Sequence, residues 1–417
     1  MEKELFRAII AENQEYIGRI PLVQRPLDLE EYGNYVFVGV RQAGKSYLLY
    51  QRIQQLLANG VEIENIVYIN FDDERLQGMS VTDFDLILQA YHSMYDSQPI
   101  FFFDEIQNVE GWANFARRLA NQKYHIYITG SNAKMLSRDI ETVLGGRYLD
   151  ISVFPYSFSE YLKAVGVLLS KNWQYGRKAN ELQRHFRTYF DWGGFPELVH
   201  FQEKRVWLNS LYNRIFFNDL VVRHKVKNED ALRLCVRRLA ESVKQPCSLN
   251  RLSNLIKATG TSCSPSTVME YVRYLQESCL LISIDNYVSK FVEKETIKKH
   301  YFVDNGLLHL FINNPNTSLL ENLCAITLYK KYGKGLYYYN KNIEVDFYVP
   351  DEGLAVQASY QMSDGETIER EVKALIALHG LYPLKRAMII TYEDEGEIVR
   401  DGLKIEIRPA WKWVLEG

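Results

Sequence analysis

The feature that most constrains the fold is a glycine-rich stretch between a short apolar run and an amphipathic one. Residues 35–40, YVFVGV, have the composition of a buried strand, and residues 48–57, LLYQRIQQLL, repeat apolar side chains at helical spacing. Between them, GVRQAGKS at residues 39–46 fits the pattern G-x-x-x-x-G-K-[ST]. A strand, such a loop and a helix predict a phosphate-binding loop on a parallel α/β sheet.

The chemistry of phosphate binding explains these residue types. Glycines let several backbone N–H groups point inward at phosphate oxygens, and the following helix adds its positive N-terminal end. Lys45 would reach the β- and γ-phosphates, and the Ser46 hydroxyl would join a Mg²⁺ shell. The N-K-x-D guanine signature is missing from the sequence, so ATP is expected rather than GTP. The predicted nucleotide-binding residues are Gly39, Val40, Arg41, Gln42, Ala43, Gly44, Lys45, Ser46 and Tyr47.

A second apolar run carries an acid pair. Residues 98–112, QPIFFFDEIQNVEGW, predict a strand that ends in Asp104-Glu105. Behind a phosphate loop, we assign Asp104 with Ser46 to the metal ion and Glu105 to the attacking water. Taken alone, an Asp-Glu pair after a strand is more often a solvated strand end.

A third run, YHIYITGSNAKML, ends in Thr129-Gly130-Ser131-Asn132. We expect Asn132 to orient the water or to sense the γ-phosphate, and the alternative is that Ser131 or Asn132 caps a following helix. NIVYINFDDERL adds another strand at residues 65–76. Strands that alternate with helices predict a parallel sheet with ligands at the carboxyl ends of its strands.

Composition sets broad limits. A chain of 417 residues predicts about two to four domains, and a net charge of −3 gives no whole-chain signal for nucleic acid. The five cysteines form no CxxC pair, so neither a zinc site nor a disulfide framework is expected. The N-terminus is charged rather than signal-like, and the apolar runs are too short to span a bilayer. We therefore expect a cytoplasmic protein without a membrane partner.

The middle of the chain changes character twice. Residues 155 to 227 are helical and aromatic, which predicts a helical lid for the nucleotide site. The next stretch has a helix ending at Gly260, a second helix opened by Ser264-Pro265, and a strand-like wing, which is a winged-helix pattern. The second helix could enter a major groove, but its basic residues are opposed by Glu270 and Glu277. DNA binding, protein interaction and a purely structural role all stay open.

Together these motifs resemble AAA-type P-loop ATPases. More closely, the chain is similar to prokaryotic ATPases that carry a C-terminal domain of unknown function, number 4143 in that series. The resemblance runs nearly end to end and rests on GVRQAGKSYLL, FFFDEIQNVEGW, ITGSNAKML, GGRYLDISVFPYSFSEYL, WGGFPELV and YFVDNGLLHLF. Gln42 stands where a second Arg is common. The implied domains are an ATPase core at 1–155, a lid at 156–235, a winged helix at 236–292 and a C-terminal domain at 293–417.

The resemblance also implies a catalytic arginine. Arg147 lies in the GGRY motif, and in oligomeric ATPases an arginine from a neighbouring copy stabilises transition-state charge. The role would make the chain a homo-oligomer. The alternative is a local ion pair between Arg147 and an acid such as Asp150. Arg138 lies in the same segment.

The last part of the chain resembles a restriction-endonuclease-like core, with the element order αββαβ. The resemblance places Glu321, Asp346 and Gln357 at acid or acid-equivalent positions and Ser359 at the position of a lysine. Gln357 is a weak ligand, Ser359 has no positive charge, and only Lys373 on a later helix could supply one. We therefore expect a domain that does not cleave nucleic acid.

The sequence as a whole predicts Mg²⁺-dependent ATP hydrolysis coupled to conformational change, acting on DNA or on a protein partner. Two alternatives stay open. One is a regulatory DNA-binding module switched by nucleotide, and the other is an ATP-dependent nuclease.

Overall fold

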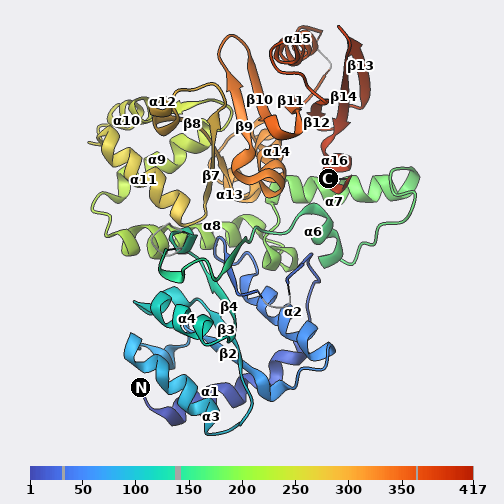
Figure 1. Cartoon of the computed structure of the whole chain (residues 1–417). Helices are drawn as coiled ribbons and strands as arrows, with labels where there is room; N and C mark the ends of the chain where they lie inside the picture. Colours follow the sequence, from blue (N-terminus) through green and yellow to red (C-terminus); the bar gives the residue numbers. More distant parts are fainter. Residues whose placement is uncertain (31–32, 137–141, 363–364, 417) are drawn as a thin grey trace. The chain divides into compact units, whose positions relative to one another are not determined.

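The computed structural model describes residues 1–30, 33–136, 142–362 and 365–416 (Figure 1). The chain forms two compact units. The first comprises Met1–Phe154 with Glu277–Cys279, and the second comprises Pro155–Gln276 with Leu280–Gly417. Across the described residues, no helix combines the length and the apolar character that crossing a lipid bilayer requires.

The first unit is built on a five-stranded sheet in the order β2-β3-β4-β1-β5, and every pairing in it is parallel. The predicted parallel sheet is therefore confirmed. The central strands are continuous apolar runs such as IFFFD because both faces of the sheet are buried. The elements are α1 Lys3–Tyr16, β1 Tyr35–Val38, α2 Lys45–Ala58, β2 Ile66–Asn70, α3 Phe84–His92, β3 Ile100–Asp104, α4 Trp112–Asn121, β4 His125–Gly130 and β5 Leu149–Ser152.

The carboxyl ends of these strands meet at one edge of the sheet. Val38 at the end of β1 pairs with Gly130 at the end of β4, and Asn70 at the end of β2 pairs with Asp104 at the end of β3. The chain leaves β1 through Gly39, where a Cβ atom would lie 2.0 Å from the carbonyl oxygen of Val153. Only glycine allows this close approach, which brings the start of the loop against the segment after β5.

The second unit begins with helices, followed by a large sheet and further helices (Figure 1). Helix α8 continues into a π-helical stretch at Ile215–Val222. The helices are α6 Phe158–Ala164, α7 Gly176–Trp192, α8 Lys204–Arg214, α9 Glu229–Glu241, α10 Leu249–Lys257, α11 Pro265–Glu277, α12 Phe291–Thr296, α13 Asn305–His309, α14 Asn316–Tyr332, α15 Gly365–Leu381 and α16 Ala410–Glu416.

Two sequence motifs form one buried joint in this unit. The Asp304 carboxylate accepts hydrogen bonds from the backbone N–H groups of Gly194 and Gly306, each at 2.8 Å. Gly193 has φ of +79°, and a Cβ atom there would lie 1.9 Å from Asp304 Oδ1. The WGGFP and VDNG motifs are therefore complementary surfaces, and the helices predicted as a lid pack within the second unit.

The sheet of the second unit has nine strands in the order β13-β14-β12-β11-β10-β9-β7-β8-β6. β7 pairs antiparallel with β8 and parallel with β9. The predicted domain boundary between residues 292 and 293 falls inside the β7–β8 hairpin, so strands on both sides of it share one sheet. The strands are β6 Cys247–Ser248, β7 Leu281–Asn286, β8 Ile297–Phe302, β9 Tyr337–Asn340, β10 Glu344–Val349, β11 Leu354–Ala358, β12 Arg386–Thr391, β13 Gly396–Arg400 and β14 Leu403–Pro409.

The predicted order αββαβ for the C-terminal part needs one correction. Residues 336–349 form two antiparallel strands, β9 and β10, with Asn340 paired to Glu344. The polar run Asn340-Lys341-Asn342 supplies the turn that divides them. β13, β14 and α16 then extend the predicted order beyond β12.

Candidate active site

The phosphate-loop lysine lies inside its own loop. Residues 39–44 connect β1 to α2, and Gly44 takes a left-handed φ of 92° immediately before Lys45 begins the helix. The Lys45 ammonium is 4% exposed and donates hydrogen bonds to the carbonyl oxygens of Gly39 at 3.1 Å and Val40 at 3.2 Å. The loop is therefore curled around the position where this cation sits.

Asp104 is the buried acid at the end of β3. Its carboxylate accepts hydrogen bonds from the hydroxyl groups of Tyr68, at 2.7 Å, of Thr129 and of Ser46. Burial raises the pKa of Asp104, and the adjacent Glu105 charge adds to this, while the three hydroxyl donors act in the opposite direction. The predicted pair of metal-binding residues, Ser46 and Asp104, is thus brought into contact.

Glu105 lies next to Lys45. Its Oε1 atom is 3.4 Å from Lys45 Nζ, and its Oε2 atom accepts a hydrogen bond from Gln107 Nε2 at 2.5 Å. Burial would raise the pKa of Glu105, but the Lys45 ammonium and the hydrogen bond from Gln107 outweigh burial and leave this pKa below its usual range. The carboxylate is therefore ionised at neutral pH and paired with the loop lysine.

Three side chains that were not predicted to contact the acid pair hold these acids in place. Thr129 is fully buried, donates to Asp104, and accepts a hydrogen bond from the backbone N–H of Glu105 at 2.9 Å. Ser131 and Gln107 both interact with the Glu105 side chain. Thr129 and Ser131 could have been found from the ITGS segment, because that strand was predicted to end beside the acids.

Arg25, which lies outside the motif, is hydrogen-bonded to the loop. Its guanidinium donates to the carbonyl oxygens of Ala43 and Phe154, each at 3.0 Å. It lies 20 residues before Lys45 in a segment without regular structure, so no spacing rule points to it.

The other predicted site residues also lie in the first unit. Asn132 is half-buried one position after Ser131, and Tyr47 is 54% exposed on α2. Arg147 is exposed, donates to the carbonyl of Gly145 at 3.0 Å, and forms no ion pair with Asp150 or with any other residue in the described ranges. Arg138 lies outside the described residues. The roles assigned to Asn132, Tyr47 and Arg147 stay predictions.

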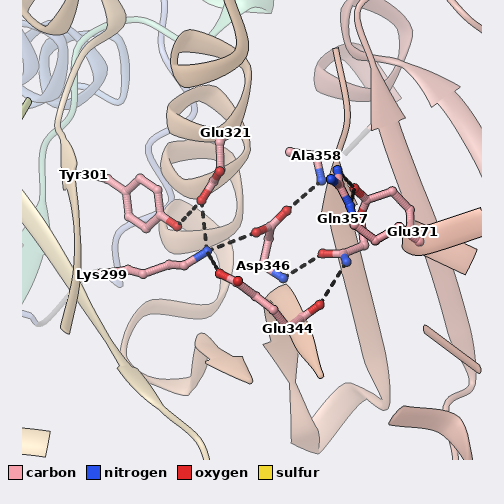
Figure 2. Close-up of polar contacts among 9 residues, drawn as sticks. Lys299, Tyr301, Glu321, Glu344, Asp346, Gln357, Ala358 and Glu371 are labelled. Atoms are coloured by element: carbon pink, nitrogen blue, oxygen red, sulfur yellow. Dashed lines mark hydrogen bonds and ion pairs between the residues drawn. The ribbon is translucent and has the colours of Figure 1, made fainter. Parts of the chain in front are cut away.

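A second charged cluster lies in the second unit (Figure 2). Lys299 on β8 is fully buried, and its ammonium contacts Asp346 at 3.0 Å, Glu321 at 3.2 Å and Glu344 at 3.3 Å. Burial alone would lower the pKa of Lys299, but the three carboxylates outweigh burial and raise it above its usual value. The sequence interpretation looked for this cation at Ser359 or Lys373 and missed Lys299, which precedes Asp346 by 47 residues.

The remaining groups of this cluster are also paired. Tyr301 donates to Glu321 at 2.8 Å, and the Ala358 N–H donates to Asp346 Oδ2 at 3.1 Å. Burial, with the nearby Asp346 charge, raises the pKa of Glu321 to about 7. The cluster lies beside a cavity of about 840 Å³ whose lining includes Lys244, Glu321, Asp346, Arg370 and Lys373.

Comparison with known proteins agrees with the geometry of the first unit. An AAA domain matches residues 32–162, and a domain of unknown function (DUF8612) matches residues 183–318. An uncharacterized protein of Methanocaldococcus jannaschii is 31% identical over 434 residues, covering 99% of this chain and 96% of that protein. An uncharacterized protein of Haemophilus influenzae is 30% identical over 394 residues, covering 91% and 94%.

Solved structures are similar only at a distance. A Walker-type ATPase of Pyrococcus abyssi has a TM-score of 0.40 at 12% identity, covering 74% of this chain and 95% of that one. AMPPCP-bound DnaA from Aquifex aeolicus has a TM-score of 0.27 at 17% identity, covering 66% and 87%. Scores this low support no statement about activity.

A phosphate loop after β1 and an acid pair after β3 on a parallel sheet define the first unit as an AAA-type P-loop domain. The chain belongs to the family of the M. jannaschii and H. influenzae proteins, which it matches over nearly its whole length. The matching domain of unknown function, at residues 183–318, runs from α7 into α14 and is a different one from the domain expected at the C-terminus, which stays a prediction.

Proposed function

We propose that the chain hydrolyses ATP in a Mg²⁺-dependent reaction at the loop of residues 39–46. The observation that carries this proposal is the contact set at the end of β3. Lys45 lies 3.4 Å from Glu105, and Ser46 is hydrogen-bonded to Asp104. The side chains that we assign to phosphate binding, to the metal ion and to the attacking water are therefore in contact in two pairs, which supports the proposal.

The residues fit both ligands of such a reaction. The Ser46 hydroxyl and the Asp104 carboxylate are hard oxygen donors of the kind that Mg²⁺ prefers. When bound, Mg²⁺ would neutralise charge on the β- and γ-phosphates. Lys45 would bind those phosphates, and Glu105 would orient the attacking water and take its proton.

The ion pair between Lys45 and Glu105 implies that ATP binds before Glu105 can act on water. While Lys45 is paired with Glu105, the carboxylate that should act on water is neutralised. Phosphate is the stronger partner for the ammonium, so ATP binding would draw Lys45 away from Glu105. The base would thus become available only when the substrate is present.

Steady-state ATPase assays with three variants test this proposal. Lys45→Ala should lose nucleotide binding and turnover, because the loop loses its only buried cation among the described residues. Glu105→Gln should still bind ATP but turn over about 10²- to 10⁴-fold more slowly, because the water loses its base. Glu110→Gln, an exposed acid five positions later, is the control and should be fully active. Normal turnover by Lys45→Ala would reject the site.

We further propose that hydrolysis is coupled to conformational change and that the partner is DNA. Residues 204–277, from the start of α8 to the end of α11, contain 13 Lys or Arg and 6 Asp or Glu, a formal charge of +7. The whole chain carries −3, so the rest of it carries −10. A basic segment in an acidic protein supports binding to a phosphate backbone.

The arrangement of these elements supports a winged helix. The order is α9-β6-α10-α11-β7-α12-β8, with β8 paired to both β6 and β7, and apart from the short α12 it is that of a winged-helix module. The basic charge lies mainly on α8 to α10 and the loops between them rather than on α11, which favours contact with the DNA backbone over reading of bases. Exposed cations of this segment are Arg205, Arg214, Lys225, Lys227, Arg237, Lys244, Arg251, Lys257 and Arg273.

Fluorescence anisotropy with a DNA duplex at several salt concentrations tests the DNA proposal. The double variant Lys225→Glu and Lys227→Glu should bind more weakly and reduce the slope of log K against log salt by about 2. Lys341→Glu, in the exposed turn after β9, is the matched control and should bind as the unaltered protein does. Equal affinities and slopes for all three proteins would remove DNA as a partner of this segment and favour a protein partner.

A regulatory switch is the second candidate function, and the Lys45–Glu105 pair favours it. If this pair re-forms slowly, the chain would stay in its nucleotide-bound state for a long time. Slow hydrolysis would then serve only to end that state. Single-turnover kinetics with and without duplex DNA separate the two functions. A chemical step much slower than nucleotide release, and unaffected by DNA, would favour the switch.

A further inference from the structure

The cluster around Lys299 has the geometry of an ion-binding site in which the cation is part of the chain. The ammonium can donate three hydrogen bonds, and it contacts three carboxylates, those of Glu321, Glu344 and Asp346, at 3.0 to 3.3 Å. Lys299 and Glu321 are buried and Asp346 is mostly so, which shields two of these contacts from water, whereas Glu344 is about half exposed. Figure 2 shows the ammonium in the middle of the three acids.

The restriction-endonuclease-like resemblance implies a divalent metal ion between Glu321, Asp346 and Gln357, and the contacts do not fit it. The Gln357 amide oxygen accepts the backbone N–H of Asp346 at 2.7 Å, and its amide nitrogen donates to the carbonyl of Glu344 at 3.1 Å. The Gln357 side-chain amide is thus bonded to the backbone of β10 through both its oxygen and its nitrogen, which holds it against that strand.

The two acids are committed as well. Asp346 uses Oδ1 for Lys299 and Oδ2 for the Ala358 N–H, and Glu321 Oε1 accepts from both Lys299 and Tyr301. Within the described ranges, His, Cys, Asp and Glu side chains form no group of three or more that could hold a metal ion. A divalent cation here would have to displace a buried ammonium from three carboxylates at once.

We propose that Lys299 is a built-in cation that takes the place of a divalent metal ion between Glu321, Glu344 and Asp346, so that this part of the protein folds and works without metal and does not cut nucleic acid. From the sequence we expected no cleavage because Gln357 is a weak ligand and Ser359 carries no positive charge, and the proposal gives a different reason. A lysine is present, but it neutralises the acids that would otherwise bind the metal.

The arrangement has a consequence for the adjoining cavity. Arg370 is bound to Glu371 at 2.6 Å, so the fourth acid near the cluster is also neutralised by a cation of the chain. Lys244 and Lys373 line the same cavity. The acidic side chains that line the cavity are therefore matched by cations of the chain itself, and no added ion is needed to neutralise them.

Mn²⁺ binding without nucleotide, followed by electron paramagnetic resonance, tests the proposal on the full chain. The unaltered protein and Asp346→Asn should bind the same number of Mn²⁺ ions, because Asp346 holds Lys299 and not a metal ion. One Mn²⁺ site present in the unaltered protein and lost in Asp346→Asn would overturn the proposal. Mn²⁺-dependent nicking of plasmid DNA that Asp346→Asn abolishes would overturn it too.

A second variant tests the role of Lys299 directly. Lys299→Met leaves three carboxylates facing one another, so its Tm should fall by several degrees, and added Mn²⁺ should recover part of that loss while leaving the Tm of the unaltered protein unchanged. Mn²⁺ stabilisation of the unaltered protein that Asp346→Asn removes would contradict the proposal. If Lys299→Met fails to fold, the comparison with Asp346→Asn alone decides. ATPase activity is measured separately on the same samples. Because Lys45 and Asp104 lie in the other unit, its loss would count against the proposed hydrolysis and not against the role of Lys299.

Discussion

At the scale of single residues, the candidate active site depends on a side chain that carries no charge. Thr129 donates to Asp104 and accepts from the Glu105 N–H, so one hydroxyl fixes both members of the acid pair. It can do so because β3 and β4 are parallel neighbours whose ends meet at one edge of the sheet. A residue of this kind positions the acids and need not touch the substrate.

Replacing this hydroxyl should therefore affect stability and turnover together. In Thr129→Val, buried Asp104 loses a donor and the Glu105 N–H loses its acceptor, which should cost about 1–3 kcal/mol of unfolding free energy. Thr129→Ser keeps the hydroxyl and is the matched control. Urea unfolding and kcat for ATP measure the two effects. A Thr129→Val protein as stable and as active as Thr129→Ser would show that the hydroxyl positions neither acid.

Sequence could predict the charged residues of the first site but not the partners that hold them. Lys45, Ser46, Asp104 and Glu105 follow from motifs whose spacing is local to one strand and its loop. Arg25 and Gln107 act through contacts that only the tertiary structure creates. Lys299 was missed for the same reason. It lies on β8, 47 residues before Asp346, and only the packing of the strands brings it to the acids.

At the scale of elements, β8 buries a charged lysine and a neutral histidine on opposite faces. Lys299 and Tyr301 point to the acid cluster, as residues two apart in a strand must, whereas His300 points the other way and bonds Ser283 at 2.8 Å. Burial, reinforced by the charge of Lys298, lowers the pKa of His300 to about 4. The strand thus buries a charged lysine beside a neutral histidine.

This neutral histidine should make the second unit sensitive to acid. His300 has a pKa of about 6.5 in the unfolded chain, so below that pH the unfolded chain binds a proton that the folded chain does not bind. The free energy of unfolding therefore falls as the pH drops toward 4, by up to about 3 kcal/mol. His300→Gln should remove that component and flatten the stability curve between these two values. Unfolding at several pH values measures the slopes, with His92→Gln on the exposed end of α3 as the control. Parallel curves for His300→Gln and the unaltered protein would contradict a neutral His300.

The fold was predicted best where one element could be interpreted alone. Four parallel strands of the first unit, β1 to β4, are apolar runs bounded by loops, and their sequence predicts them directly, whereas the short and mostly exposed β5 was not predicted. The nine-stranded sheet joins β7 to β9 across 50 residues, and the turn at Asn340 divides what looked like one long segment. Pairings between strands far apart in the sequence depend on which strand edges remain unpaired. Those edges are defined only when the whole second unit packs.

At the scale of the whole molecule, the phosphate loop and the basic segment lie in different units. The first unit holds the phosphate loop and the acid pair, and the basic segment from α8 to α11 lies almost entirely in the second. The proposed hydrolysis in the first unit could act on the proposed partner of the second only if both units respond to the same nucleotide. An arginine supplied between copies is one way to tie that response to assembly.

Mixing two inactive variants would test whether Arg147 acts between copies of the chain. Its guanidinium is exposed and bound only to the carbonyl of Gly145 among the described residues, so it is available to a neighbour. Arg147→Ala should bind ATP but lose about 10³-fold or more in turnover if it supplies transition-state charge. Lys45→Ala keeps Arg147 but lacks a working loop, so a mixture of the two should regain part of the activity through mixed contacts. Activity should also rise more than linearly with protein concentration. Full turnover by Arg147→Ala, with assembly unchanged in analytical ultracentrifugation, would reject the role, and a mixture as inactive as its components would reject action between copies.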